Sequence, residues 1–112
     1  VEWSGREPEF EKRAAFALMA SAAVHRKDLP DAAFASLLPV IRAQAIDERN
    51  YVKKAVSWAL RQIGKRNSGL NPRAIRTAEQ IERIDSRAAR WVARDALREL
   101  RSDAVQARLR KS

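Results

Sequence analysis

Apolar side chains recur every three or four residues through most of the chain, which is the period of an amphipathic α-helix. The pattern is clearest in residues 51–65, where Val52, Val56, Leu60 and Ile63 fall on one side of a helix. Alternating segments typical of strands are nearly absent, whereas Ala, Leu, Arg, Glu and Gln, which favour helices, are prominent. The chain is therefore predicted to be all-α.

Prolines and small polar residues mark the ends of the predicted helices. The start signals are Pro8, Asp28 with Pro30, Asp47 or Asn50, Asn71 as an N-cap before Pro72, Asp85 or Ser86, and Ser102. Pro39 predicts a kink or break in the second helix, because proline lacks the amide hydrogen that a helix interior uses. The predicted helices span about residues 8–26, 30–46, 47–64, 72–84, 86–101 and a short stretch after 102.

The third and fifth predicted helices match at an offset of 33 residues. The matched pairs are Lys54 and Arg87, Val56 and Ala89, Trp58 and Trp91, Leu60 and Ala93, Arg61 and Arg94, Ile63 and Ala96, and Lys65 and Arg98. Helix pairs that repeat at such intervals are typical of HEAT-like solenoids. We therefore predict a single domain over residues 1–112, a HEAT-like solenoid of about six helices in antiparallel pairs. A four-helix bundle is the competing architecture.

Positive charge is concentrated in the later part of the chain. The 112 residues carry a net charge of +9, with −2 over residues 1–48 and +11 over residues 49–112. Arg outnumbers Lys by 17 to 6, and the guanidinium group suits forked contacts to phosphate. This distribution favours a bound polyanion, and a solvated Arg-rich surface is the alternative.

Several classes of site are excluded by composition. The chain has no cysteine and a single histidine, His25, so thiolate metal sites, cysteine nucleophiles and multi-histidine metal centres are excluded. We therefore expect no metal, and we expect no cofactor. We also expect no membrane segment, because the longest apolar run, residues 14–20, is too short to span a bilayer. The only methionine, Met19, is internal, and we expect the chain to be part of a longer protein.

Two tryptophans lie off the apolar stripes of their helices. Trp58 shares its face with Tyr51, Lys54, Arg61 and Lys65, and Trp91 shares its face with Arg87, Arg94 and Arg98. An indole among cations is suited to gripping phosphates and stacking on a base, an interaction worth about 1–3 kcal/mol per base. The alternative is that each indole packs against the next repeat or against an arginine.

Other polar residues have structural explanations beside functional ones. Arg13 lies on an apolar helix and needs a carboxylate such as Glu9 or a ligand phosphate. His25 is expected to cap or pack at the end of the first helix, and Asp47 and Asp85 to cap helices. Asp95 is expected to form an ion pair with Arg94 or Arg98.

Two stretches carry a resemblance to a known family. YVKKAVSWALRQIGKRN at 51–67, preceded by FEKRAAFAL at 10–18, resembles the AlkD-like DNA alkylation-repair glycosylases. The likeness runs from about Trp3 to Leu100, in the order of that family's C-terminal half. The family is built of HEAT-like repeats and releases alkylated purines such as 3-methyladenine and 7-methylguanine from DNA.

The resemblance implies roles for particular residues. Arg13 falls on the family's functional arginine with Phe10 in the aromatic position before it, and Trp58 falls on a tryptophan that lines the lesion cleft. Lys54 and Arg61 match flanking basic positions. The segment between Arg13 and Trp58 is longer than in the family and contains Pro39. The family's catalytic aspartate belongs to an N-terminal half that this chain does not contain.

The resemblance therefore implies the DNA-binding part of a bacterial, cytoplasmic, monomeric alkylpurine DNA glycosylase that needs no cofactor. The expected partner is double-stranded DNA with alkylated purines, and the expected reaction is hydrolysis of the N-glycosidic bond. Arg13 and Trp58 would line the lesion cleft, with DNA contacts from Tyr51, Lys54, Arg61, Lys65, Arg87, Trp91, Arg94 and Arg98. A non-catalytic nucleic-acid-binding repeat protein and a protein-interaction scaffold are the alternatives.

Overall fold

The computed structural model describes the backbone of residues 7–111 and the side chains of residues 11–111. Within that range the chain forms seven helices and no strand. The helices are α1 (Glu7–His25), α2 (Asp31–Ala35), α3 (Leu38–Gln44), α4 (Asn50–Arg66), α5 (Leu70–Glu82), α6 (Arg87–Leu100) and α7 (Asp103–Arg110). The predicted all-α fold is confirmed.

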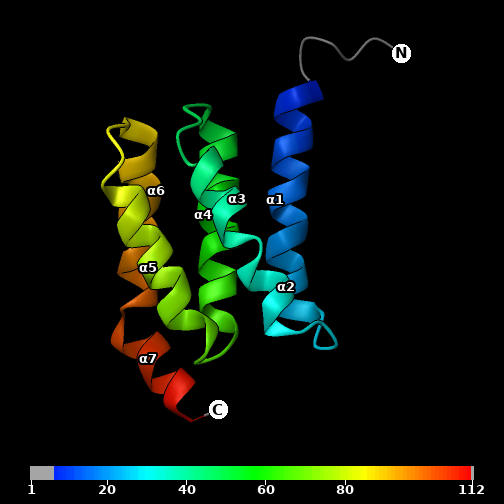
Figure 1. Ribbon diagram of the computed structural model, residues 1–112, viewed down its shortest axis with the longest axis vertical. Helices are drawn as coiled ribbons and strands as arrows, with labels where there is room; N and C mark the ends of the chain where they lie inside the picture. The colour runs from blue at the N-terminus through cyan, green and yellow to red at the C-terminus, as the bar shows by residue number, and fades with distance from the viewer. Residues whose placement is uncertain (1–6, 112) are drawn as a thin grey trace.

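The helices form two layers (Figure 1). Helices α1, α4 and α6 lie side by side and run in the same direction, with α4 contacting both of its neighbours. Helices α3 and α5 run in the opposite direction and cover one face of that row. This arrangement of antiparallel helix pairs is the one predicted from the repeat.

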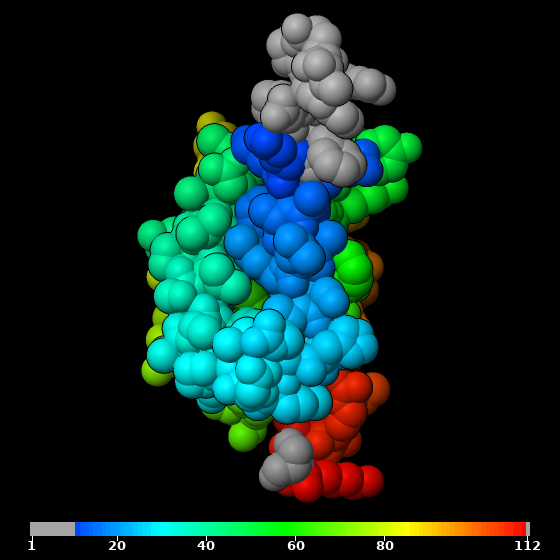
Figure 2. Space-filling model, turned by 90° about the vertical axis from the view of Figure 1, so that its right-hand side faces the viewer, coloured from blue at the N-terminus to red at the C-terminus, as the bar shows by residue number. Residues whose placement is uncertain are grey.

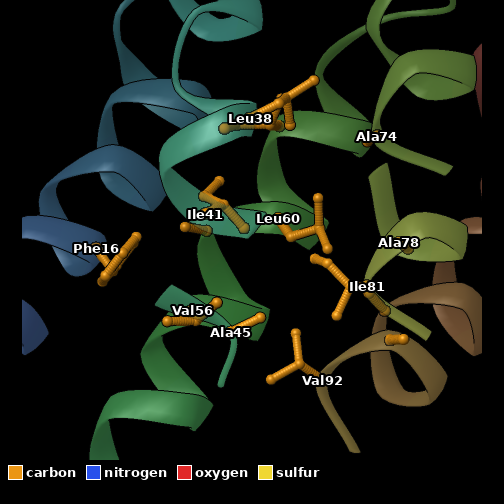
Figure 3. Close-up of a cluster of buried hydrophobic side chains, with 14 of the residues drawn as sticks. Phe16, Leu38, Ile41, Ala45, Val56, Leu60, Ala74, Ala78, Ile81 and Val92 are labelled. Carbon is orange, nitrogen blue, oxygen red and sulfur yellow. The ribbon is translucent and has the colours of Figure 1, made fainter. Parts of the chain in front are cut away.

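The core lies between the two layers (Figure 3). Ile41 of α3 and Ile81 of α5 point toward Leu60 of α4, and all three are fully buried. The apolar positions matched by the 33-residue offset are also fully buried, as predicted; they are Val56, Leu60 and Ile63 on α4 and Ala89, Ala93 and Ala96 on α6. Full burial of a Val, Leu or Ile side chain stabilises the fold by roughly 1.5–3 kcal/mol.

The second predicted helix is divided in two. Helix α2 ends at Ala35, and α3 begins at Leu38 with Pro39 in its first turn. Proline is tolerated there because the first amide groups of a helix have no partner within it. The break that Pro39 predicted is confirmed, and it explains why the described residues hold one helix more than expected.

Asn71 is not the N-cap that the sequence predicted. Helix α5 begins at Leu70, two residues before the predicted start at Pro72, and the side chain of Asn67 accepts a hydrogen bond from the amide of Leu70 at 2.8 Å. Asn71 is buried, and its Nδ2 donates to the carbonyl of Gly64 at 3.0 Å. The buried amide thus joins α5 to α4 instead of ending a helix.

The caps of α4 and α6 were predicted only in part. Neither Asp47 nor Asn50 caps α4: Arg49 is its N-cap, while Asp47 accepts the amide hydrogen of Arg49 and forms an ion pair with Lys12. Of the two candidates at the start of α6, Ser86 is confirmed as the N-cap, because its hydroxyl accepts from the amide of Ala89, whereas Asp85 stays exposed beside Arg90. Ser102 caps α7, as expected, and His25 ends α1 as an exposed residue.

Gly64 allows α4 to approach its neighbours closely. A Cβ atom at this position would lie 2.5 Å from Cδ2 of Leu100 and 2.9 Å from Cβ of Ala74. Both distances are shorter than carbon atoms tolerate, so a side chain here would push α5 and α6 away from α4. The close approach fixes the position of α6 beside α4, and with it the contacts between their polar side chains.

Candidate nucleic-acid interface

The side of α4 opposite its buried stripe carries Tyr51, Lys54 and Trp58. Their spacing of three and then four residues places them on one face of the helix. Tyr51 is 61% exposed and Trp58 is 40% exposed, and the Lys54 side chain is exposed as well. Both aromatic side chains are therefore partly accessible to a ligand.

Helix α1 supplies the opposite wall. Arg13, Ala14 and Ala17 face this part of α4, and together with it they enclose a groove of about 420 Å³. The small alanine side chains leave the space open beside Trp58. The atoms of α4 emerge next to those of α1 on the side away from α3 (Figure 2). We call this the α1/α4 groove; its lining residues are Arg13, Ala14, Ala17, Tyr51, Lys54, Ala55 and Trp58.

Arg13 is held by an aromatic ring. Its guanidinium carbon lies 5.1 Å from the centre of the Tyr51 ring, within the range of a cation–π interaction. Among the side chains of residues 11–111, Arg13 has no carboxylate partner; Glu9 and Phe10, which the sequence placed beside it, lie outside the described side chains. Within the described side chains, no carboxylate binds the guanidinium hydrogens of Arg13, and such a group is suited to a phosphate.

Arg61 and Lys65, farther along α4, are engaged by α6. Nη1 of Arg61 lies 3.0 Å from Glu99, and Nζ of Lys65 lies 2.7 Å from the other oxygen of the same carboxylate. The hydrogen bond from Lys65, followed by that from Arg61, holds the pKa of Glu99 below its ordinary value. Both cations are thus partly neutralised, although the sequence placed them with the phosphate-binding residues.

Asp95 completes this network between α4 and α6. Its Oδ2 accepts a hydrogen bond from the buried hydroxyl of Ser57 at 2.7 Å and lies 3.6 Å from Nε of Arg61. Its Oδ1 lies 3.7 Å from Nη1 of Arg98, so the predicted pairing with Arg98 is confirmed. Arg94 instead lies 3.9 Å from Glu82.

Trp91 is 37% exposed, almost as much as Trp58. However, Nζ of Lys53 lies over its ring, 5.4 Å from the centre. Trp91 lines none of the grooves described in this part of the chain. Arg87, which the repeat matches to Lys54, is exposed.

A second positively charged pocket lies near the C-terminal ends of α1 and α4. Lys27, Lys65, Arg66 and Arg108 line a space of about 370 Å³ there. Arg66 has a structural role, because it donates hydrogen bonds to three backbone carbonyls at the end of α1 and just beyond it, and stacks on Phe34 at 4.3 Å. Lys27 and Arg108 are exposed and extend the positive surface beyond Lys65.

The structure therefore brings together four of the predicted site residues and separates the others. Arg13, Tyr51, Lys54 and Trp58 share one groove, whereas the others lie along α4 and α6, among them residues bound to carboxylates.

Within the described residues, no cluster of His, Cys, Asp or Glu could hold a metal ion, and no helix is long and apolar enough to cross a membrane.

A family model described as DNA alkylation repair enzyme matches residues 1–100. The chain belongs to this family. No curated protein and no solved structure matches the chain significantly. The match includes every helix from α1 to α6, and therefore both walls of the α1/α4 groove. Membership of the DNA alkylation repair family supports a role for the chain in DNA repair.

Proposed function

We propose that this DNA alkylation repair protein is the DNA-binding part of an alkylpurine DNA glycosylase, which hydrolyses the N-glycosidic bond of 3- or 7-alkylated purines. The observation that carries the proposal is the convergence of Arg13, Lys54 and Trp58 on one open groove. In this proposal Trp58 contacts the alkylated nucleotide, and the two cations hold the phosphates beside it.

The chemistry of the lesion favours this arrangement. Alkylation at N3 or N7 gives the purine a positive charge, which weakens its bond to the sugar. The electron-rich face of an indole attracts such a cationic base, and stacking contributes about 1–3 kcal/mol. The groove volume of about 420 Å³ lies within the range of roughly 300–1,000 Å³ that is usual for small-molecule sites.

The cations fix the position of the DNA without selecting its sequence. Neither Lys54 nor Arg13 has a carboxylate partner among the side chains of residues 11–111, and Arg13 lies over the Tyr51 ring. We further propose that the positive surface continues past Lys65 toward Lys27 and Arg108, so that the strand crosses α4 from one end to the other.

Hydrolysis also develops positive charge on the sugar, which a fixed carboxylate would stabilise. By the family resemblance, that carboxylate belongs to an N-terminal half of the protein. We therefore propose that the 112-residue chain is the C-terminal part of a monomeric cytoplasmic enzyme, and that it binds double-stranded DNA but needs the other half for turnover.

The test is release of 7-methylguanine from a methylated duplex by the full-length protein. We expect release, and we expect the Trp58→Ala variant to reduce it while keeping the wild-type circular dichroism spectrum. The Lys111→Ala variant, which removes an exposed cation far from the groove, is the control. Tight binding of the duplex without any release would overturn the enzymatic proposal in favour of a non-catalytic DNA-binding protein. Failure to bind would favour a protein-interaction scaffold.

A further inference from the structure

The layer formed by α3 and α5 carries a cationic groove that the proposed DNA contacts do not use. Arg73, Arg76 and Gln80 occupy positions i, i+3 and i+7 of α5, which places them on one face of that helix. Arg42 of α3 lies opposite, with its Nη1 2.7 Å from Oε1 of Gln80. These four residues, with Ala35, Leu38, Pro39 and Thr77, enclose about 180 Å³ between the two helices. We call this space the outer groove.

The arginines of the outer groove lack the ion pairs seen elsewhere. No carboxylate lines it, and neither Arg73 nor Arg76 has an ion-pair partner among the side chains of residues 11–111. By contrast, Arg61 on α4 and Arg101 after α6 are both bound by carboxylates. Like charges that converge without a counterion repel one another, so an anion in the outer groove would be attracted by all three guanidinium groups.

The hydrogen bond between Arg42 and Gln80 holds one of these cations in place. Because Gln80 supplies only a neutral oxygen, the guanidinium keeps its full charge and its remaining hydrogens. A cation that is already oriented loses less conformational entropy when it binds a ligand.

The shape of the groove favours an extended ligand over a compact ion. From Arg73 to Gln80 the row covers seven residues of helix, or about 10 Å at 1.5 Å per residue. An extended peptide rises about 3.3 Å per residue, so three or four residues would follow the whole row. The apolar surface of Ala35, Leu38 and Pro39 would receive side chains between the carboxylates. None of the lining residues is aromatic, so the stacking that single-stranded nucleic acid uses is not provided.

We propose that the outer groove is a docking site for an acidic peptide segment of a partner protein. The outer groove is lined mainly by α3 and α5, which form one layer, whereas the lining residues of the α1/α4 groove come from the other layer (Figure 1). DNA bound in the α1/α4 groove would therefore leave the outer groove accessible, and the two ligands bind at the same time. The partner is recognised by its carboxylates and by small apolar side chains spaced along an extended backbone.

The experiment measures binding of a fluorescein-labelled peptide of three Asp-Asp-Leu repeats to the full chain by polarisation at physiological salt. The double variant Arg73→Gln/Arg76→Gln should weaken binding at least about tenfold, because it removes two of the charge-assisted hydrogen bonds to the peptide carboxylates. The matched control Arg110→Gln/Lys111→Gln removes the same charge from the end of α7 and should change the affinity about twofold or less. Glutamine favours helices, and all four positions are exposed.

Three further results would separate this proposal from the proposed DNA contacts. Trp58→Ala should leave peptide binding unchanged, and Arg73→Gln/Arg76→Gln should leave duplex binding within about twofold, since exposed charges outside an interface contribute little. An Asn-Asn-Leu peptide should not bind. Equal loss of peptide binding in both double variants, or loss of duplex binding that matches the loss of peptide binding, would overturn the proposal. Displacement of the peptide by equimolar inorganic phosphate would also overturn it.

Discussion

Helix α4 has a neighbour on each side, and the two contacts differ at the surface. Toward α1, the small side chains of Ala14 and Ala17 leave a groove beside Trp58. Toward α6, Asp95 and Glu99 reach α4 and bind its hydroxyl group and its cations. Among the described side chains, α4 therefore presents Lys54 without a carboxylate partner at an open groove on one side, and a network of ion pairs on the other.

The two tryptophans that the repeat relates show the same difference. Their exposed fractions, 40% for Trp58 and 37% for Trp91, are nearly equal. Yet Trp58 borders the α1/α4 groove, whereas Lys53 stacks over the ring of Trp91. A repeat thus determines which residues face outward, but the neighbouring helix determines whether an outward ring has room for a ligand.

Filling the α1/α4 groove with a larger side chain is expected to change the affinity for duplex DNA most. The Ala17→Leu variant should weaken duplex binding about tenfold or more, a loss of about 1.4 kcal/mol, because the larger side chain would occupy the space beside Trp58. Leucine is a strong helix former, so α1 should remain folded. The measurement is a fluorescence-polarisation titration with a short duplex at fixed salt.

The matched control is Ala15→Leu, which adds the same atoms to an exposed position of α1 outside the groove. It should bind the duplex as the wild type does. Equal affinities for the two variants would show that DNA does not enter the groove, and the contrast between the two sides of α4 would lose its functional meaning.

Removing the carboxylate that binds the cations on the α6 side is expected to raise the affinity for the duplex, by a smaller factor than Ala17→Leu lowers it. The Glu99→Gln variant removes the carboxylate that binds Arg61 and Lys65. Duplex affinity should then rise about fivefold, roughly 1 kcal/mol. The slope of log affinity against log salt should steepen by about one to two units, since each new phosphate contact adds about 0.9.

For comparison, Asp85→Asn removes one negative charge from an exposed residue outside the network. Its salt slope should equal that of the wild type. If the two variants raised duplex affinity equally, the gain would come from net charge alone, and Arg61 and Lys65 would make no specific contact with DNA.

A separate prediction concerns the stability of the fold and the ion pair that joins α1 to the segment before α4. Asp47 accepts hydrogen bonds from Arg49 and Lys12, and these hold its pKa well below the ordinary value. Asp47→Asn should lower the free energy of unfolding by about 1–2 kcal/mol at pH 7. Because a depressed carboxyl pKa stabilises the fold above the unfolded value of about 3.9 and loses that effect as pH falls, the wild type should approach the variant in acid.

Urea denaturation from pH 7 down to pH 3 tests this prediction. Asp28→Asn, which breaks an exposed ion pair with Arg26 in a loop, should leave unfolding at pH 7 unchanged. A constant difference between the wild type and Asp47→Asn at every pH would show that the carboxylate charge does not join these helices.

Much of the fold could be predicted because it depends on local spacing. The 3.6-residue period gave the buried stripe of α4, and the 33-residue offset gave the matching stripe of α6. The same period placed Trp58 and Trp91 outside the core. Pro39 marked the break between α2 and α3 because the covalent structure of proline requires it.

The remaining features depend on contacts between distant segments. Glu99 lies 34 residues from Lys65 and 38 from Arg61, so their pairing follows from how α6 packs against α4. Asn71 resembled a cap in sequence, but its amide hydrogen-bonds to the backbone of α4 inside the core. Ala14 and Ala17 gave no signal of function, because their contribution is the space that they leave beside Trp58.

The central claim is that DNA binds beside Trp58 and not beside Trp91, and the most direct test is a duplex titration of Trp58→Ala and Trp91→Ala at the same salt concentration. Loss of a stacked base should weaken binding by Trp58→Ala about tenfold, within the range of 1–3 kcal/mol. Trp91→Ala should stay within about twofold of the wild type, because an exposed residue outside the interface contributes little. Equal losses, or a larger loss for Trp91→Ala, would contradict the account.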